Sequence, residues 1–174
     1  MKNVLRVVIL TLLTFLPFRQ TAAMGQFFEM ENIHLGRQAP DFTLKTLGGK
    51  STVMSQYRAG QPAIVFFWAT WCPHCREALE DLNNRKDQLA QKGIKVILVD
   101  LGESIEEVRP HIQKNKIGFE VFLDEDTSLA EAYGIIGVPT FFLLNKDGMV
   151  QAVEHELPQD YEQLLLKSSA QAAK

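Results

Sequence analysis

Two cysteines are the residues whose type and spacing most directly indicate chemistry in this chain. Both lie in the segment Trp71-Cys72-Pro73-His74-Cys75, and the 174 residues contain no other cysteine. A disulfide between residues three apart closes a loop too small to restrain the unfolded chain much, because disulfide stabilisation grows with loop length. The pair is therefore badly placed as a structural crosslink. It suits a bond that opens and closes during thiol-disulfide exchange.

The sequence on either side of the motif predicts the elements that must position it. Residues 63–68 (Ala-Ile-Val-Phe-Phe-Trp) form a continuous apolar run, which is typical of a strand buried on both faces. From Cys75 onward, apolar residues follow helical spacing up to Gly93, where we expect the helix to end. Cys72 then lies at a strand-to-helix junction, with Pro73 at the helix position that proline favours.

This junction predicts different roles for the two cysteines. Unpaired backbone N–H groups and the positive end of the helix dipole would face the sulfur of Cys72. Such settings lower a cysteine pKa from about 8.5 to about 3.5 to 7, so we interpret Cys72 as the nucleophile. Cys75 lies one turn deeper on the same helix face, and we interpret it as the resolving thiol. We expect no cofactor beyond this redox-active disulfide.

His74 has two interpretations. Its ring can donate a hydrogen bond or carry a positive charge next to the Cys72 sulfur, which would stabilise the thiolate and raise the reduction potential. Alternatively, it is a tolerated exposed residue in the first helical turn. We favour the first interpretation. His34, His111 and His155 show no partner pattern, and we expect them at the surface.

Metal binding is an alternative use of a Cys-x-x-Cys pair. A structural zinc needs four ligands, with a second pair at suitable spacing, and this chain offers only scattered histidines. We therefore expect no metal site. A role in carrying copper through Cys72 and Cys75, or in binding a partner without catalysis, is an alternative that metal analysis of anaerobically purified protein would test.

The rest of the pattern predicts an α/β fold. Strand patterns occur at residues 39–44, 52–53, 94–99, 121–123, 140–144 and 149–153, and helical patterns follow residue 104 and span 128–133 and 158–167. Ser104 opens a capping-box sequence, and Pro110 would kink the helix that follows it or delay its start. Strands alternating with helices, then a closing hairpin, favour a sheet covered on both faces.

The first 23 residues are typical of a secretory signal peptide. Lys2 and Arg6 precede an apolar run over residues 7–18, and small residues end the segment at Ala22 and Ala23. The run is about twelve residues, against the roughly twenty that a membrane-spanning helix needs. We therefore expect cleavage and a periplasmic or otherwise exported protein. The alternative is an N-terminal membrane tether that leaves the cysteines facing the same compartment.

The chain after this segment is long enough for one ordinary domain. Residues 24–37 are polar and poorly patterned, so we expect a flexible segment there, followed by a domain over residues 38–170. The formal net charge is −3, and no basic run occurs. This acidic balance argues against nucleic acid as a partner.

Three motifs, in order along the chain, carry a family resemblance. They are Ala39-Pro40-Asp41-Phe42, the segment 67–75 around the cysteines, and residues 133–140 (Tyr-Gly-Ile-Ile-Gly-Val-Pro-Thr). Together they resemble the TlpA/ResA-like branch of the thioredoxin superfamily, over about Gln38 to Leu166. The resemblance implies a thioredoxin fold: a central mixed sheet with helices on both faces and an N-terminal β-hairpin extension.

The resemblance also implies an activity and further site residues. Pro139 would be a cis-proline facing the cysteine pair, and the cis form costs little for proline. Val138 would offer its backbone to a substrate strand, Trp71 would shape access to Cys72, and Trp68 would belong to the core. The implied enzyme is a thiol:disulfide oxidoreductase acting on protein thiols or disulfides, with a membrane redox partner.

Three positions depart from the related patterns. Phe66 stands where many thioredoxin-fold enzymes have a buried acid, so proton handling must come from elsewhere. Ala78 stands where this branch often has glutamate, and Thr140 where members dedicated to cytochrome c maturation often do. A reductase for cytochrome c maturation is therefore the weaker alternative.

The direction of electron flow has conflicting signals. The scaffold resembles exported reductases, whereas the Pro73-His74 dipeptide resembles DsbA-type oxidants. We expect a general exported oxidoreductase that is fairly oxidising for its branch. A peroxiredoxin-like enzyme is a further alternative, although its peroxidatic cysteine normally follows a threonine three residues earlier, where this chain has Ala69 before Cys72.

Overall fold

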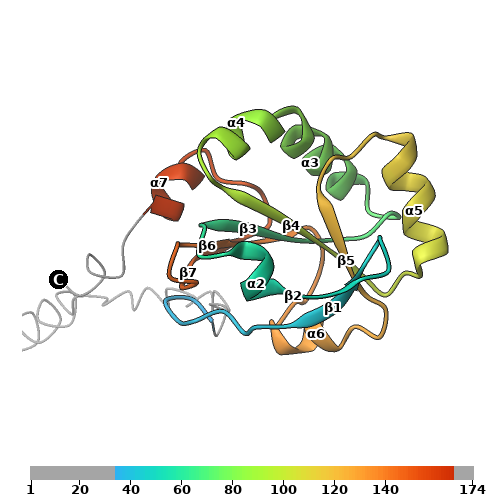
Figure 1. Cartoon of the computed structure of the whole chain (residues 1–174), viewed down its shortest axis with the longest axis horizontal. Helices are drawn as coiled ribbons and strands as arrows, with labels where there is room; N and C mark the ends of the chain where they lie inside the picture. Colours follow the sequence, from blue (N-terminus) through green and yellow to red (C-terminus); the bar gives the residue numbers. More distant parts are fainter. Residues whose placement is uncertain (1–33, 167–174) are drawn as a thin grey trace, which may run out of the picture. The chain divides into compact units, whose positions relative to one another are not determined.

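A seven-stranded mixed sheet forms the centre of the fold. The computed structural model describes residues 34–166. The strands are β1 (Thr43–Thr46), β2 (Ser51–Val53), β3 (Ala63–Trp68), β4 (Lys95–Leu101), β5 (Glu120–Asp124), β6 (Thr140–Leu144) and β7 (Val150–Glu154). Their order across the sheet is β2-β1-β5-β4-β3-β6-β7 (Figure 1). β4 is parallel to β3 and β5, and the other neighbouring strands are antiparallel.

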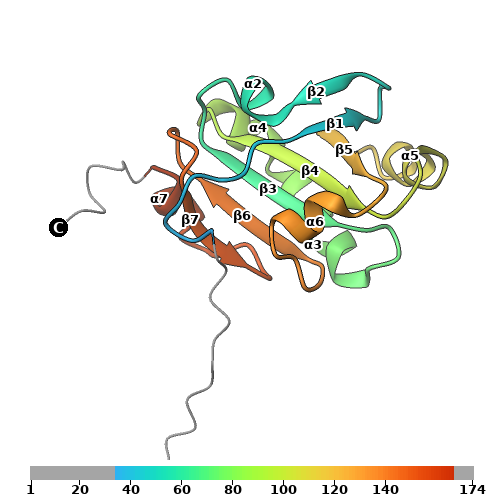
Figure 2. The same ribbon diagram turned by 90° about the horizontal axis from the view of Figure 1, so that it is seen from below.

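Helices cover both faces of this sheet. They are α2 (Met54–Arg58), α3 (Pro73–Asn84), α4 (Lys86–Gln91), α5 (Ile105–Lys114), α6 (Ser128–Ala132) and α7 (Tyr161–Leu166). α3, α4, α5 and α7 supply side chains to one hydrophobic core, and α2 and α6 supply side chains to the other. Figures 1 and 2 show the two layers on opposite sides of the strands. The predicted mixed sheet with helices on both faces is confirmed.

β3 is the strand that leads into the cysteine motif, and it is the best buried. All six of its residues are fully buried. Ile64, Phe66 and Trp68 face the core beneath α3, while the alternate residues face the opposite core. Phe66 stacks on Phe141 of β6, with ring centroids 4.3 Å apart. The end of β3 is thereby fixed from both sides.

The N-terminal hairpin is present, but its first strand is shorter than expected. β1 and β2 pair in antiparallel fashion, and β1 also pairs with β5, so the hairpin extends the main sheet. The prediction of a strand over residues 39–44 is wrong at its start, because β1 begins at Thr43. Ala39 and Phe42 instead fill the core on the α2 side, and the Ala39 N–H donates to the Gly148 carbonyl.

Two predictions about the helices are also wrong. The single helix expected up to Gly93 is two helices, α3 and α4, which meet at Arg85. The side chain of Asn83 hydrogen-bonds the Lys116 carbonyl and the Gly118 N–H, so a contact distant in sequence holds the end of α3. Pro110 does not delay α5, which begins at Ile105 behind the predicted capping box and continues through the proline.

The predicted signal peptide lies outside the described residues, as do most of the segment 24–37 and the end of the predicted domain. No helix within residues 34–166 is both long and apolar enough to cross a membrane.

Candidate active site

The cysteine motif sits at the N-terminus of α3, directly after β3. Cys72 is the N-cap residue, with extended backbone angles, and Pro73 is the first helical residue. The chain therefore turns from a buried strand into a helix at the sulfur itself. The Cys72 sulfur accepts a hydrogen bond from the Cys75 N–H at 3.1 Å. One of the unpaired donors of the first helical turn is thus directed at this sulfur.

Cys72 and Cys75 form a disulfide, with their Cα atoms 5.2 Å apart. The Cys72 residue keeps 4% of its surface exposed, and Cys75 keeps none. Cys72 is therefore the sulfur nearer to solvent, although it too is largely covered. Both residues belong to the core on the α3 side of the sheet.

Trp71 and His74 flank this disulfide at the surface. Trp71 is 67% exposed, an unusual state for a large apolar side chain, and Trp68 is fully buried as expected. The His74 side chain is 83% exposed, and its Nδ1 atom lies 3.6 Å from a Glu77 carboxylate oxygen. In this oxidised form the ring is thus directed at Glu77.

The segment before β6 approaches the disulfide from the other side. The Val138 carbonyl oxygen lies 3.7 Å from the Cys72 sulfur, and the Val138–Pro139 peptide bond is cis. The Thr140 hydroxyl donates to the Gly137 carbonyl, and the His155 Nδ1 atom lies 2.8 Å from the Pro139 carbonyl oxygen. The structure therefore brings Val138 and Pro139 together with the cysteine pair.

A buried glutamate ties down the loop between β3 and α3. The carboxylate of Glu103, in the connection from β4 to α5, accepts hydrogen bonds from the Thr70 N–H at 2.6 Å and from the Thr70 hydroxyl. Thr70 lies two residues before Cys72. Hydrogen bonds to an ionised acceptor are stronger than neutral ones. Glu103 thus fixes the approach of the chain to the reactive sulfur.

A second buried acid lies on the same face of the sheet as the cysteines. Asp100 of β4 is the register partner of Trp68, and strand alternation places it on the Trp68 face. Asp100 is fully buried, and its carboxylate oxygens have no hydrogen-bond partner in the described part of the chain. Burial first, and then the neighbouring Glu103, raise the pKa of Asp100 to about 9. The group is therefore neutral at pH 7.

The predictions for three histidines need correction. His111 is half-buried and lies against Trp68, with ring centroids 5.6 Å apart, and burial lowers its pKa. His34 is half-buried too, with Nε2 2.7 Å from the Ala132 carbonyl oxygen. His155 is exposed as expected, but it contacts Pro139. All three pack against segments distant in sequence, which local spacing cannot reveal.

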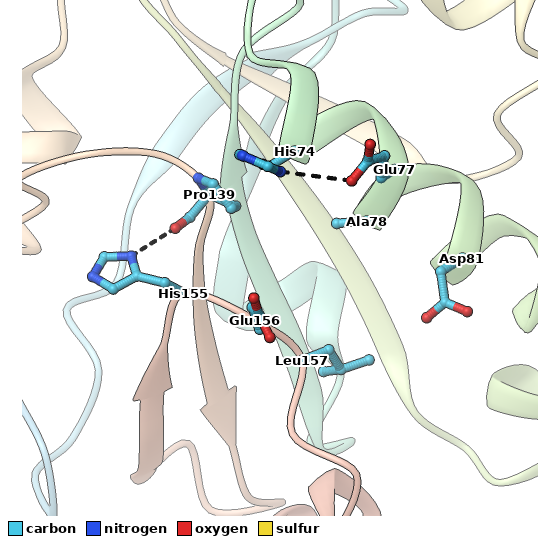
Figure 3. A pocket seen from close by; sticks show the side chains of 8 residues that line it. All are labelled: His74, Glu77, Ala78, Asp81, Pro139, His155, Glu156 and Leu157. Atoms are coloured by element: carbon cyan, nitrogen blue, oxygen red, sulfur yellow. Dashed lines mark hydrogen bonds and ion pairs between the residues drawn. The ribbon is translucent and has the colours of Figure 1, made fainter.

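A pocket opens beside the disulfide, between α3 and the segment that follows β7. Figure 3 shows Ala78 directed toward its centre, with Pro139 on the opposite wall and His74 and His155 on either side of the proline. Its cavity volume is about 440 Å³. The sequence gave no signal for the residues contributed by the segment after β7. They reach the site only because β7 pairs with β6.

Comparison with known proteins assigns the family. A model of the AhpC/TSA family matches residues 35–153, which is more than half of the chain. The chain belongs to the AhpC/TSA family. Within this family it is similar to the thiol-disulfide oxidoreductase ResA of Bacillus thuringiensis subsp. konkukian, with 31% identity over 75% of each chain.

Solved structures of similar proteins agree with this assignment. StoA from Bacillus subtilis is 31% identical, with a TM-score of 0.59 over 72% of this chain and 93% of that one. A thiol:disulfide interchange protein of the thioredoxin family from Chlorobium tepidum is 26% identical, with a TM-score of 0.63 over 74% of this chain and 92% of that one. The ResA-like resemblance and the thioredoxin fold are confirmed, and the family member described here is a thiol-disulfide oxidoreductase.

Proposed function

We propose that this family member is an exported enzyme that exchanges disulfides with protein substrates through Cys72 and Cys75. One observation carries the proposal. The Cys72–Cys75 disulfide lies at the N-terminus of α3, with the more exposed sulfur 3.7 Å from the Val138 carbonyl oxygen. This arrangement supplies a nucleophile, a resolving thiol and a backbone edge for a substrate.

The reductive direction follows from the positions of the two sulfurs. The Cys72 thiolate attacks one sulfur of a substrate disulfide, and the other substrate sulfur leaves and takes up a proton. Cys75 then loses its proton and attacks the Cys72 sulfur, which releases the second substrate thiol and forms the Cys72–Cys75 bond. Two electrons pass to the substrate. The oxidative direction runs the same steps backwards.

The geometry supports Cys72 as the attacking sulfur. Its sulfur accepts the Cys75 N–H, and such a donor favours the charged form of the thiol. Cys75 is fully buried, which keeps external disulfides away from it. Val138 is the residue whose carbonyl oxygen is nearest to the Cys72 sulfur, which supports a role for its backbone in binding an extended substrate. Trp71 and Pro73 would shape access and helix start.

Export and a membrane redox partner complete the proposal. Their support is the arrangement of charged, apolar and small residues over the first 23 positions. N-terminal sequencing of the protein from a fractionated host tests export. A chain that begins near residue 24 in the periplasmic fraction is the expected result. A full-length chain in the cytoplasmic fraction would contradict it.

Trapping tests the exchange chemistry directly. Replacing Cys75 with serine removes the resolving thiol, so mixed disulfides between Cys72 and protein substrates should accumulate in cell envelopes. A chain with both cysteines replaced by serine is the control and should trap nothing. Non-reducing electrophoresis with mass spectrometry identifies the bonded sulfur. Absence of trapped proteins in the Cys75→Ser variant would argue against protein substrates.

A further inference from the structure

The pocket beside the disulfide combines an apolar wall with an acidic edge. Ala78, Pro139 and Leu157 supply apolar surface, and Glu77, Asp81 and Glu156 supply carboxylates (Figure 3). No lysine or arginine lines it. An apolar wall with an acidic edge matches the chemistry of a basic side chain, which has an aliphatic stem and a charged head.

The three carboxylates differ in how far they are already neutralised. Asp81 accepts a hydrogen bond from Arg85 at 3.0 Å, and Glu77 lies 3.6 Å from the exposed ring of His74. Glu156 has no hydrogen bond or ion pair with any residue that the structure describes. It is therefore the carboxylate that stands ready for a charge brought from outside.

The pocket is continuous with the place where a substrate must lie. Pro139 lines the pocket and directly follows Val138, whose carbonyl oxygen is 3.7 Å from the Cys72 sulfur. His74 also lines the pocket and lies two residues from Cys72. An extended chain advances about 3.3 Å per residue. A side chain a few residues from a cysteine bonded to Cys72 can therefore reach the pocket.

We propose that this pocket binds a lysine or arginine side chain of the polypeptide whose cysteine exchanges with Cys72. The enzyme thereby prefers protein substrates with a basic residue close to the reactive cysteine. The proposal rests on the exchange function proposed above. Its stem would pack on Ala78 and Leu157, and its charged head would meet Glu156.

Peptide disulfides of matched sequence test this preference. Each peptide carries one cysteine as a mixed disulfide with mercaptoethanol, and lysine, glutamine or glutamate two residues before or after it. The reduced full chain reacts to form the Cys72–Cys75 bond, and the peptide thiol and mercaptoethanol leave with its two electrons and two protons. Chromatography of the released peptide thiol gives the rate. The glutamine peptide measures exchange without the charge.

We expect the lysine peptide to react about three- to fivefold faster than the glutamine peptide at low salt, from at least one of the two positions. This is the size expected of one or two solvent-exposed ion pairs, and salt should reduce it. Glu156→Gln should bring the ratio close to one. Asp87→Asn on α4 makes the same change in net charge at an exposed position outside the pocket and should leave the ratio unchanged.

Two results would overturn the proposal while leaving the exchange function intact. One is equal rates for the lysine and glutamine peptides at both positions. The other is a lysine preference that Glu156→Gln and Asp87→Asn reduce equally, because this would reflect net charge and not the pocket. Failure of every peptide to react would instead overturn the exchange function, and the proposal with it.

Discussion

Asp100 is the residue at which protonation and folding are most directly linked. Its pKa is raised to about 9, whereas an aspartate in an unfolded chain has a pKa of about 3.9. Between these values the folded protein holds a proton that the unfolded chain has lost. The folded state therefore binds more protons, and its stability falls as the pH rises through this window.

Replacing Asp100 with asparagine should remove this fall. The amide keeps the size of the side chain and stays neutral, so the free energy of unfolding should depend less on pH between about 5 and 8. One proton accounts for a slope of up to about 1.4 kcal/mol per pH unit. Urea unfolding of the oxidised protein measures it, with Asp87→Asn as the exposed control. Identical slopes for the original chain and Asp100→Asn would contradict the raised pKa.

The sequence located the cysteines and Pro139 but not the acids around them. Cys72, Cys75 and Pro139 lie in local motifs, so their types and spacing were sufficient. Asp100 approaches Trp68 only through the register between β3 and β4, and Glu103 reaches Thr70 from another loop. The one local signal was an acid that directly follows the apolar run at residues 94–99.

Among the elements, the connection from β4 to α5 supports the loop that precedes the cysteine motif. Glu103 is the link, because its carboxylate accepts both the N–H and the hydroxyl of Thr70. Local spacing also explains why α3 and α4 were expected as one helix. The apolar pattern continues across Arg85, whereas the break is held by the contact of Asn83 with residues 116–118.

Removing the Glu103 carboxylate should therefore weaken both the fold and the site. Glu103→Ala leaves the Thr70 N–H without its acceptor, which should cost about 1–3 kcal/mol of stability, and a looser loop should slow exchange with a neutral peptide. Thr70→Val removes only the hydroxyl and should cost less. Urea unfolding and peptide exchange rates measure the two effects. A Glu103→Ala variant as stable as the original chain would count against the link.

For the whole molecule, the direction of electron flow depends on the difference in stability between its reduced and oxidised forms. A positive charge on His74 beside a Cys72 thiolate would stabilise the reduced form. We therefore expect a glutathione titration to give a reduction potential above the thioredoxin value of about −270 mV, toward about −120 mV.

His74→Ala should move this potential back toward the thioredoxin value. Glu77→Gln is the matched test, because Glu77 is the carboxylate nearest to the His74 ring and its removal should favour contact with the sulfur. A potential near −270 mV that neither substitution changes would show that His74 does not tune the site.

The central claim is that Cys72 is the reactive sulfur because it lies at the N-terminus of α3. Alkylation of the reduced protein as a function of pH, with the modified residue identified by mass spectrometry, tests it most directly. The account predicts that Cys72 is modified first, with an apparent pKa well below the 8.5 or so of a free cysteine, while Cys75 stays protected. Modification of Cys75 first, or a Cys72 that ionises like free cysteine, would contradict it.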